Sequence, residues 1–246
     1  MNRSSALMVA ALLAVAPAAR SGDTHWGLGV GVGVRERPYI DVDSETRARP
    51  ILVFDNRWIS VSGPGIDLKL PSAGPVSFAL RVDYSRDGYE ASDSPALVGM
   101  LEREDSFWYG AAATWRNAIV NVSAEWLNDA EDNSGGQRAS LGLQRGFEFG
   151  KFELTPRLSA NWLSEDYVDY YYGVSTAEAS PTRAAYRGDA AVNFEAGLRT
   201  TYSIQARQSL FLDLRVETLD SVIEDSPIVD GSTQSSVFVG YVYMFR

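Results

Sequence analysis

The 246-residue chain contains no cysteine and a single histidine, His25. Without cysteine it can form neither a disulfide framework nor a thiolate metal site, and it has no thiol nucleophile. One histidine gives little basis for a Ser-His-Asp triad or a multi-histidine metal site. We therefore expect a protein that is not an enzyme and that uses no cofactor and no metal.

Long apolar runs and an excess of positive charge are also missing. Beyond the N-terminal segment, no stretch approaches the roughly 18 uninterrupted apolar residues that indicate a transmembrane helix. The 22 Lys and Arg residues are outnumbered by 32 Asp and Glu residues, which gives a formal net charge of -10. Because a nucleic-acid-binding surface needs clustered positive charge, we do not expect nucleic acid as a partner.

The N-terminal segment has the composition of a secretory signal peptide. Arg3 precedes an apolar run at 7–16, which is too short to span a bilayer as a helix, and small residues follow at 16–19. The sequence therefore predicts a signal peptide over residues 1–19 and an exported domain over residues 20–246.

Most of the exported domain alternates between apolar and polar residues, which is the period of a β-strand. The alternation is clear at 26–34, 76–84, 107–115, 118–126, 139–149, 152–162, 192–204, 210–217 and 237–245. Such runs are longer than the roughly 5 to 6 residues of an average strand. They match the roughly 9 to 11 residues with which a tilted strand crosses a bilayer.

Glycine occupies every second position in the first of these runs, 26–34. A dinucleotide-binding fingerprint is excluded, because Val32 or Val34 stands where the third glycine of the motif is required. The apolar residues of this run share one face of a strand, and the four glycines share the other. We expect the glycines to face the interior of a barrel, where they leave room for neighbouring side chains.

Aromatic and charged residues indicate what lies on each face of the strands. Trp115, Trp126 and Trp162 lie near strand ends on the apolar face, as in the aromatic girdle of an outer-membrane barrel. The opposite faces carry charges in mid-strand, which we expect to line the lumen: Arg81, Asp83, Glu125, Glu153, Arg157, Glu195, Arg199, Asp213, Arg215 and Glu217. Because both signs occur, ion pairing that plugs the lumen is favoured over a selective channel.

The connections between the runs are alternately short and long. Short turns fall at 55–56, 72–74, 117, 150–151 and 205–207, and long loops at 37–47, 85–105, 129–136, 164–188 and 220–234. If 62–65 is also a reversal, twelve strands result, with every long loop at one end and both termini at the other. If 57–71 is instead one bulged strand, the count becomes ten. The predicted fold is all-β, a transmembrane antiparallel up-and-down β-barrel of about twelve strands.

Five blocks of the chain, in this order, resemble the MipA/OmpV family of outer-membrane proteins, the MltA-interacting proteins: 50–56, 61–65, 97–100 followed by Arg103, 170–174 with Glu178 and Ala179, and 225–229. The resemblance covers essentially the whole exported domain. It implies a location in the outer membrane of a Gram-negative envelope, in contact with lipid and lipopolysaccharide. It also implies a non-enzymatic scaffold that brings a murein hydrolase together with a murein synthase in peptidoglycan metabolism, and it defines no catalytic residues.

Other functions are weighed against the scaffold. A diffusion pore for small solutes, or an antibiotic-permeable channel, would use the charged inner face. An outer-membrane lipase or protease is disfavoured, because the lone histidine lies at the opposite rim from the long loops. Acidic loop residues could gather divalent cations near lipopolysaccharide phosphates, but without a spaced ligand set we interpret them as a solvated surface: Glu102, Glu104, Asp105, Glu165, Asp166, Asp169, Glu224 and Asp225.

The alternation makes a direct prediction for two neighbouring residues. Leu158→Arg should lower the free energy of unfolding by about 2–4 kcal/mol, because the side chain faces the middle of the bilayer. Ser159→Arg should cost far less, because that side chain faces the lumen. Denaturant unfolding in lipid vesicles measures both, and equal penalties at the two sites would contradict the alternation.

Overall fold

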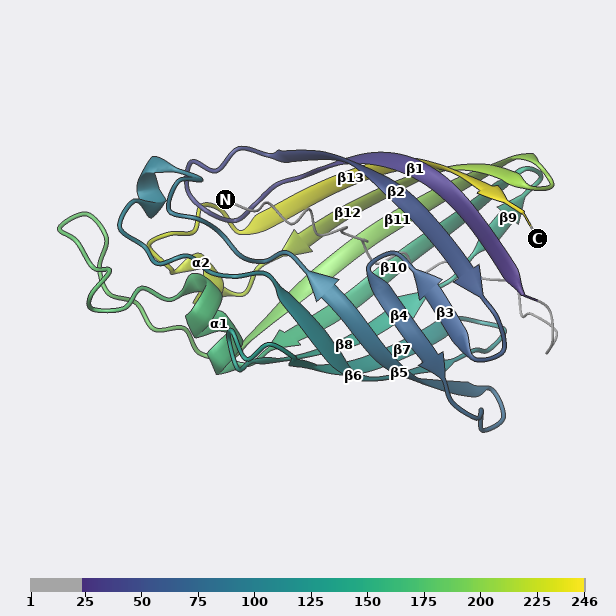
Figure 1. Cartoon of the computed structure of the whole chain (residues 1–246), viewed down its shortest axis with the longest axis horizontal. Coiled ribbons are helices and arrows are strands. Elements are labelled where there is room, and N and C mark those ends of the chain that lie inside the picture. The colour runs from purple at the N-terminus through teal and green to yellow at the C-terminus, as the bar shows by residue number, and fades with distance from the viewer. Residues whose placement is uncertain (1–23, 246) are drawn as a thin grey trace, which may run out of the picture.

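A computed structural model describes residues 24–245, so the predicted signal peptide over 1–19 lies outside the described residues. The described part forms one antiparallel sheet (Figure 1). Its strands are β1 (His25–Arg35), β2 (Glu45–Asp55), β3 (Ile59–Ser62), β4 (Gly65–Lys69), β5 (Val76–Ser85), β6 (Ser106–Trp115), β7 (Asn121–Asp129), β8 (Gln137–Gln144), β9 (Phe147–Phe149), β10 (Phe152–Leu163), β11 (Ala191–Gln205), β12 (Gln208–Thr218) and β13 (Thr233–Met244).

The sheet closes on itself into a barrel. β1 pairs with β13 at one junction and β10 pairs with β11 at the other, so the ladder has no free end. β8 and β9 both pair with β10 at successive positions, and together they act as one interrupted strand of the wall. The barrel therefore has 12 strands, and the reversal at 62–65 separates β3 from β4 as the twelve-strand prediction requires.

The break between β8 and β9 differs from the unbroken alternation that the sequence suggests over 139–149. The backbone N–H of Arg145 donates to the carbonyl of Pro156 at 3.3 Å, so the carbonyl and nitrogen of Pro156 both face this break. Because proline has no N–H to donate to a ladder, it is tolerated in a strand where the pairing is interrupted. The irregularity therefore has a cause on the neighbouring strand, which periodicity within 139–149 does not show.

The two faces of the sheet have opposite character, as the alternation predicts. Apolar side chains point outward and are exposed, with Val30 at 59%, Leu158 at 59% and Phe194 at 62%. Polar side chains on the same strands point inward, and Asp213 is only 3% exposed. An apolar outer belt around a charged interior is the arrangement of a barrel that spans a lipid bilayer.

The glycines of β1 make room for an aromatic ring inside the barrel. A Cβ atom on Gly31 would lie 2.4 Å from Cζ of Phe238, and one on Gly33 would lie 2.6 Å from its Cδ2. The Phe238 ring packs against Phe211, with ring centroids 5.8 Å apart. The structure agrees with the expectation that these glycines face inward and leave space for neighbours.

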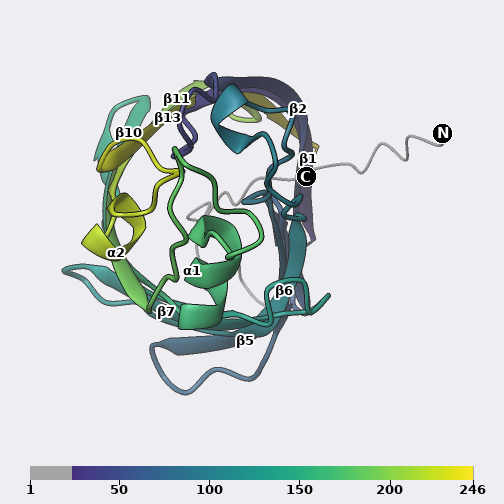
Figure 2. The same ribbon diagram turned by 90° about the vertical axis from the view of Figure 1, so that its left-hand side faces the viewer.

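All the long connections lie at one end of the barrel, which we call the long-loop end (Figure 1). They contain η1 (Pro95–Leu97), α1 (Glu165–Tyr172) and α2 (Ser221–Glu224). Figure 2 looks onto this end and shows α1 lying within the mouth of the barrel and α2 at its rim. Within residues 24–245, no helix is long and apolar enough to cross a membrane.

The contact between Gly33 and Phe238 gives a testable pair of substitutions. Gly33→Ala should lower the free energy of unfolding by about 1–3 kcal/mol, because the new methyl group collides with the ring. In a Phe238→Ala background the same substitution should cost much less, because the ring is gone. Urea unfolding in vesicles, followed by tryptophan fluorescence, measures the cycle. An identical cost in both backgrounds would show that the ring is not what the glycine accommodates.

Candidate functional site

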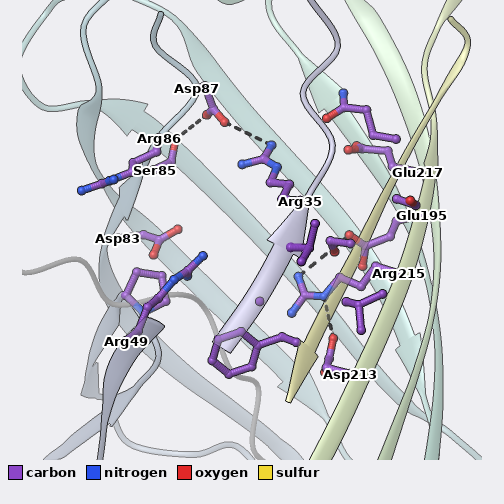
Figure 3. Close-up of a pocket in the computed structure, with 18 of the residues that line it drawn as sticks. Arg35, Arg49, Asp83, Ser85, Arg86, Asp87, Glu195, Asp213, Arg215 and Glu217 are labelled. Carbon is purple, nitrogen blue, oxygen red and sulfur yellow. Dashed lines mark hydrogen bonds and ion pairs between the residues drawn. The ribbon is translucent and has the colours of Figure 1, made fainter. Parts of the chain in front are cut away.

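The long-loop half of the barrel encloses a cavity of about 320 Å³, which we call the luminal cavity. Figure 3 shows its charged side chains converging from several strands of the wall. The charged residues that line it are Arg35 of β1, Arg49 of β2, Asp83 of β5, Arg86 and Asp87 just after β5, Arg138 of β8, Glu195 and Arg199 of β11, and Asp213, Arg215 and Glu217 of β12.

Asp213 is the centre of the largest charge cluster at this cavity. Its carboxylate accepts hydrogen bonds from three guanidinium groups, at 2.8 Å from Arg157, 2.7 Å from Arg199 and 2.9 Å from Arg215. Arg199 also lies over the Phe211 ring, at 5.0 Å from its centroid. Because a buried charge is tolerated only when it is paired and hydrogen-bonded, these groups hold one another against the part of the inner wall formed by β10, β11 and β12.

Further ion pairs connect other strands across the interior. Arg81 of β5 contacts Asp67 of β4 at 2.7 Å and Glu125 of β7 at 2.5 Å. Asp87, just beyond β5, lies 3.7 Å from both Arg35 of β1 and Arg138 of β8. Charges of opposite sign therefore alternate around the inner wall of the barrel instead of forming a strip of one sign.

The ten charged residues proposed from the sequence fall into three groups. Asp83, Glu195, Arg199, Asp213, Arg215 and Glu217 border the luminal cavity. Arg81, Glu125 and Arg157 do not border it and lie in the ion pairs described above. Glu153 lies apart from both, near the break between β8 and β9, where the Thr155 hydroxyl donates to it at 3.4 Å.

Five charged residues of the cavity were not anticipated from the sequence: Arg35, Arg49, Arg86, Asp87 and Arg138. Arg35, Arg86 and Asp87 lie where a strand meets a long loop, so alternation does not assign them a face. Arg49 lies in β2, which begins at Glu45, inside the range expected to be a loop. A weak signal was present, because Arg47, Arg49 and Ile51 alternate with Ala48 and Pro50.

A hydrophobic cluster closes the barrel above the cavity, and we call it the loop cap: Tyr39, Tyr89, Leu97, Met100, Trp108, Leu127, Leu163, Tyr167, Val168, Tyr171, Tyr172, Val174, Ala191, Leu219, Ile223, Ile228 and Val229. Short α1 begins at the N-cap Ser164, whose hydroxyl accepts from the Tyr167 N–H at 3.3 Å. Its tyrosines bridge to other loops, since the Tyr167 hydroxyl donates to Asp87 at 2.9 Å and the Tyr171 hydroxyl donates to the Glu104 carbonyl at 3.1 Å.

Glu178 ties the two longest loops of the cap together. Its carboxylate accepts hydrogen bonds at 2.9 Å from the Leu101 N–H, the Ser175 N–H and the Arg103 guanidinium. Burial alone would raise the pKa of Glu178, but these donors outweigh it and lower the pKa from 4.5 to about 2. Residues 97–100, Arg103, 170–174 and Glu178, which carry the family resemblance, thus meet in this cap.

The lowered pKa predicts how the cap responds to acid. A carboxylate with a depressed pKa stabilises the folded state above its unfolded pKa, and that contribution is lost as the pH falls through the folded value. Protection of residues 97–103 against hydrogen exchange, corrected for intrinsic rates, should therefore decrease between about pH 4.5 and about pH 2.

Two variants separate this effect from general acid unfolding. Glu178→Gln should reduce the protection of 97–103 already at neutral pH, because the charge-assisted bonds are weakened. Glu165→Gln removes an exposed ion pair with Arg187 and should leave that protection unchanged. Equal behaviour of the two variants would mean that Glu178 does not hold the loops together.

Comparison with known proteins agrees with this architecture. The model of the family "MltA-interacting protein MipA" matches residues 28–245. The chain is 25% identical over 252 residues to the MltA-interacting protein of Escherichia coli K12, covering 100% of both chains. It is 26% identical over 157 residues to the outer membrane protein OmpV of Vibrio cholerae, covering 64% of this chain and 61% of that protein.

Among solved structures, the chain is similar to the COG4313 outer membrane channel from Pseudomonas putida F1. The identity is 11%, the coverage is 93% of this chain and 97% of that chain, and the TM-score is 0.47. The family match spans nearly all of the described residues, and the "Putative outer membrane protein YiaT" of Escherichia coli K12, 23% identical, covers 96% of this chain and 98% of its own length. This chain is an outer-membrane β-barrel protein that belongs to the MipA family of MltA-interacting proteins.

Proposed function

We propose that this barrel is a non-enzymatic scaffold, which brings a murein hydrolase and a murein synthase together at the periplasmic side of the outer membrane. The observation that carries the proposal is the covered mouth of the lumen. The loop cap lies over the mouth, and paired charges of both signs line the interior, so the barrel presents surfaces rather than an open axial pore. The name of its relatives, MltA-interacting protein, supports a partner among the murein enzymes.

The short-turn end offers side chains suited to a protein partner. In outer-membrane barrels the short turns face the periplasm, where peptidoglycan lies. Trp58 is 56% exposed in the turn between β2 and β3, and the Arg57 guanidinium lies 4.2 Å from the centroid of its ring. Ile119, in the turn between β6 and β7, is 76% exposed. Exposed Trp and Arg are the residue types that most often anchor protein interfaces.

The arrangement of acids and bases supports a non-enzymatic role. His25, the single histidine of the chain, begins β1 at the short-turn end. The buried carboxylate of Glu178 lies in the loop cap at the other end, where guanidinium and backbone N–H groups already occupy it. A general base needs to reach a nucleophile within hydrogen-bond distance, and Glu178 lies at the opposite end of the barrel from His25. Asp55, which is opposite His25 in the β1–β2 pair, is held in an ion pair with Lys69 at 2.5 Å.

Crosslinking in cells tests the scaffold. A photo-reactive amino acid at Trp58 or Lys151, both in short turns, should capture a murein hydrolase and a murein synthase. The same amino acid at Glu102, in the long loop between β5 and β6, should capture neither, because that loop faces away from the periplasm. Capture from Glu102 as well as from the turns, or from no position, would contradict the scaffold.

The second candidate function, a diffusion pore, is tested by conductance. Purified barrel in a planar bilayer should show no steady ion steps, because the loop cap covers the axial path. Steady steps that persist in the folded wild-type protein would favour the pore. Heat-modifiable migration on a gel verifies that the barrel is folded in the sample.

A further inference from the structure

The wall of the barrel is interrupted in its long-loop half. β2 pairs with the short β3 only over Val53–Asp55, and β5 pairs with the short β4 only over Ala79–Val82. Within residues 24–245, no strand pairs with 45–52 of β2 or with 83–85 of β5 on the sides that face each other. At a rise of roughly 3.3 Å per residue, the unpaired edge of β2 is about 26 Å long.

Other parts of the chain bound this interruption on every side, and we call the interruption the lateral window. The turn at 63–64 between β3 and β4 forms its base, while β2 and β5 form its sides. At its top, the Arg37 guanidinium donates to the Gly88 carbonyl and pairs with Asp93 at 3.1 Å. These contacts join the loops that leave β1 and β5, so the opening is bounded and does not continue into the mouth of the barrel.

Pro50 shows that the sequence of β2 suits an unpaired edge. The Asn56 N–H donates to the Ile59 carbonyl at 2.9 Å, so the backbone groups of even-numbered residues in β2 point toward β3 and the window. Pro50 belongs to this set, and it has no N–H to leave without a partner. Proline within a strand is found at edges where its nitrogen faces away from a paired neighbour.

The luminal cavity reaches this window. Arg49 of β2, Pro64 at the base and Asp83 of β5 all border the cavity. Both sides and the base of the window therefore contribute residues to the lining of the cavity. Tyr84 and Ser85, which follow Asp83 and alternate between the two faces of β5, border it as well. Unpaired backbone at membrane depth is tolerated where it lines a polar cavity, and the window meets this condition.

The side of the cavity next to the window is rich in polar atoms without hydrogen bonds, although Nε of Arg86 lies 3.7 Å from Oδ2 of Asp105. Buried side-chain atoms that have no hydrogen bond within residues 24–245 include Nε of Arg49, Oδ1 of Asp83, Nε of Arg86 and Oε1 of Gln234, all of which line the cavity. Figure 3 shows Arg49, Asp83 and Arg86 together on one side, across from Asp213 and Arg215. Buried polar groups in native proteins are nearly always satisfied, so these atoms mark where a polar ligand group would bind.

The charge of the lining favours an anion. Six arginines face five carboxylates in the cavity, although the whole chain carries a formal charge of -10. Arg35, Arg86, Arg138, Arg199 and Arg215 each lie within ion-pair distance of a carboxylate, which for Arg86 is that of Asp105. Among the described residues, Arg49 has no carboxylate within ion-pair distance, and its guanidinium lies 5.6 Å from the centroid of the Phe238 ring. Arg49 is therefore the cation available to a ligand.

We propose that the luminal cavity binds the head of a single-tailed anionic amphipathic molecule, which enters sideways from the membrane through the lateral window. A carboxylate or phosphate head accepts hydrogen bonds from Arg49 and Arg86, and hydroxyl or ammonium groups on the head donate to Asp83 and Gln234. The tail stays in the lipid beside the exposed edge of β2. The loop cap closes the axial route, and a cavity of about 320 Å³ suits a small head group.

Photolabelling in vesicles tests the proposal. The folded barrel in phosphatidylcholine vesicles is exposed to a 12-carbon fatty acid that carries a diazirine next to its carboxylate, and labelled residues are mapped by mass spectrometry. The label should concentrate on 45–52 and 82–86. The corresponding fatty alcohol, which has no charge, should label the outer belt without preference for the window. Equal patterns for the acid and the alcohol on the wild-type barrel would overturn the proposal.

Variants identify the residue that recognises the head. Arg49→Gln should weaken saturable labelling by about tenfold, which corresponds to the loss of one charged hydrogen bond. Arg49→Lys should keep part of the binding, and Arg116→Gln, in a short turn, should keep all of it. Unchanged labelling of folded Arg49→Gln would overturn the assignment. Full competition by inorganic phosphate alone would also overturn it, because it would identify a site for soluble anions that needs no tail.

Discussion

The structure depends on one constraint, which is that a backbone polar group in lipid has no water to bind. A strand therefore crosses a bilayer with its edges paired, except where an unpaired edge lines a polar cavity. The ladder closes by joining β13 to β1, and within residues 24–245 the edges of β2 and β5 at the lateral window are the exception. The alternation of side chains follows from closure, since every second residue then faces lipid. The two prolines within strands follow the same rule. Proline has no backbone N–H to pair, and Pro50 and Pro156 both occur where the ladder is interrupted.

Closure of the barrel also determines which side chains occupy its interior. A barrel of this size encloses more room than a single layer of small side chains fills. Ion pairs around Asp213 and the Phe211 and Phe238 rings occupy part of this room, and the luminal cavity remains. The loops above it form a second apolar core of tyrosines. A covered mouth is consistent with a barrel that works through its surfaces, and the lateral window gives the luminal cavity an exit into the membrane instead of along the axis.

Much of the fold follows from the sequence because period-two alternation is a local property. The faces of the strands and the number of strands could be inferred from it, and the short segment 57–71 already indicated a weak place in the wall, where β3 and β4 are now seen to be short. The partners of each charge could not be inferred, since Arg157 and Asp213 lie on strands that are not adjacent. The loop cap was missed because its tyrosines, such as Tyr167 and Tyr171, become buried only when distant loops meet.

The central claim is that lipid surrounds the barrel and that the lumen is polar. Three consecutive alanines of β6 allow the most direct test of this claim. Single substitutions Ala111→Cys, Ala112→Cys and Ala113→Cys are small, and the chain has no other cysteine to interfere. Spin labels attached there in vesicles report their collisions with oxygen, which concentrates in lipid, and with a water-soluble nickel complex. The account predicts high oxygen accessibility at 111 and 113 and low accessibility at 112. Equal oxygen accessibility at all three positions would contradict it.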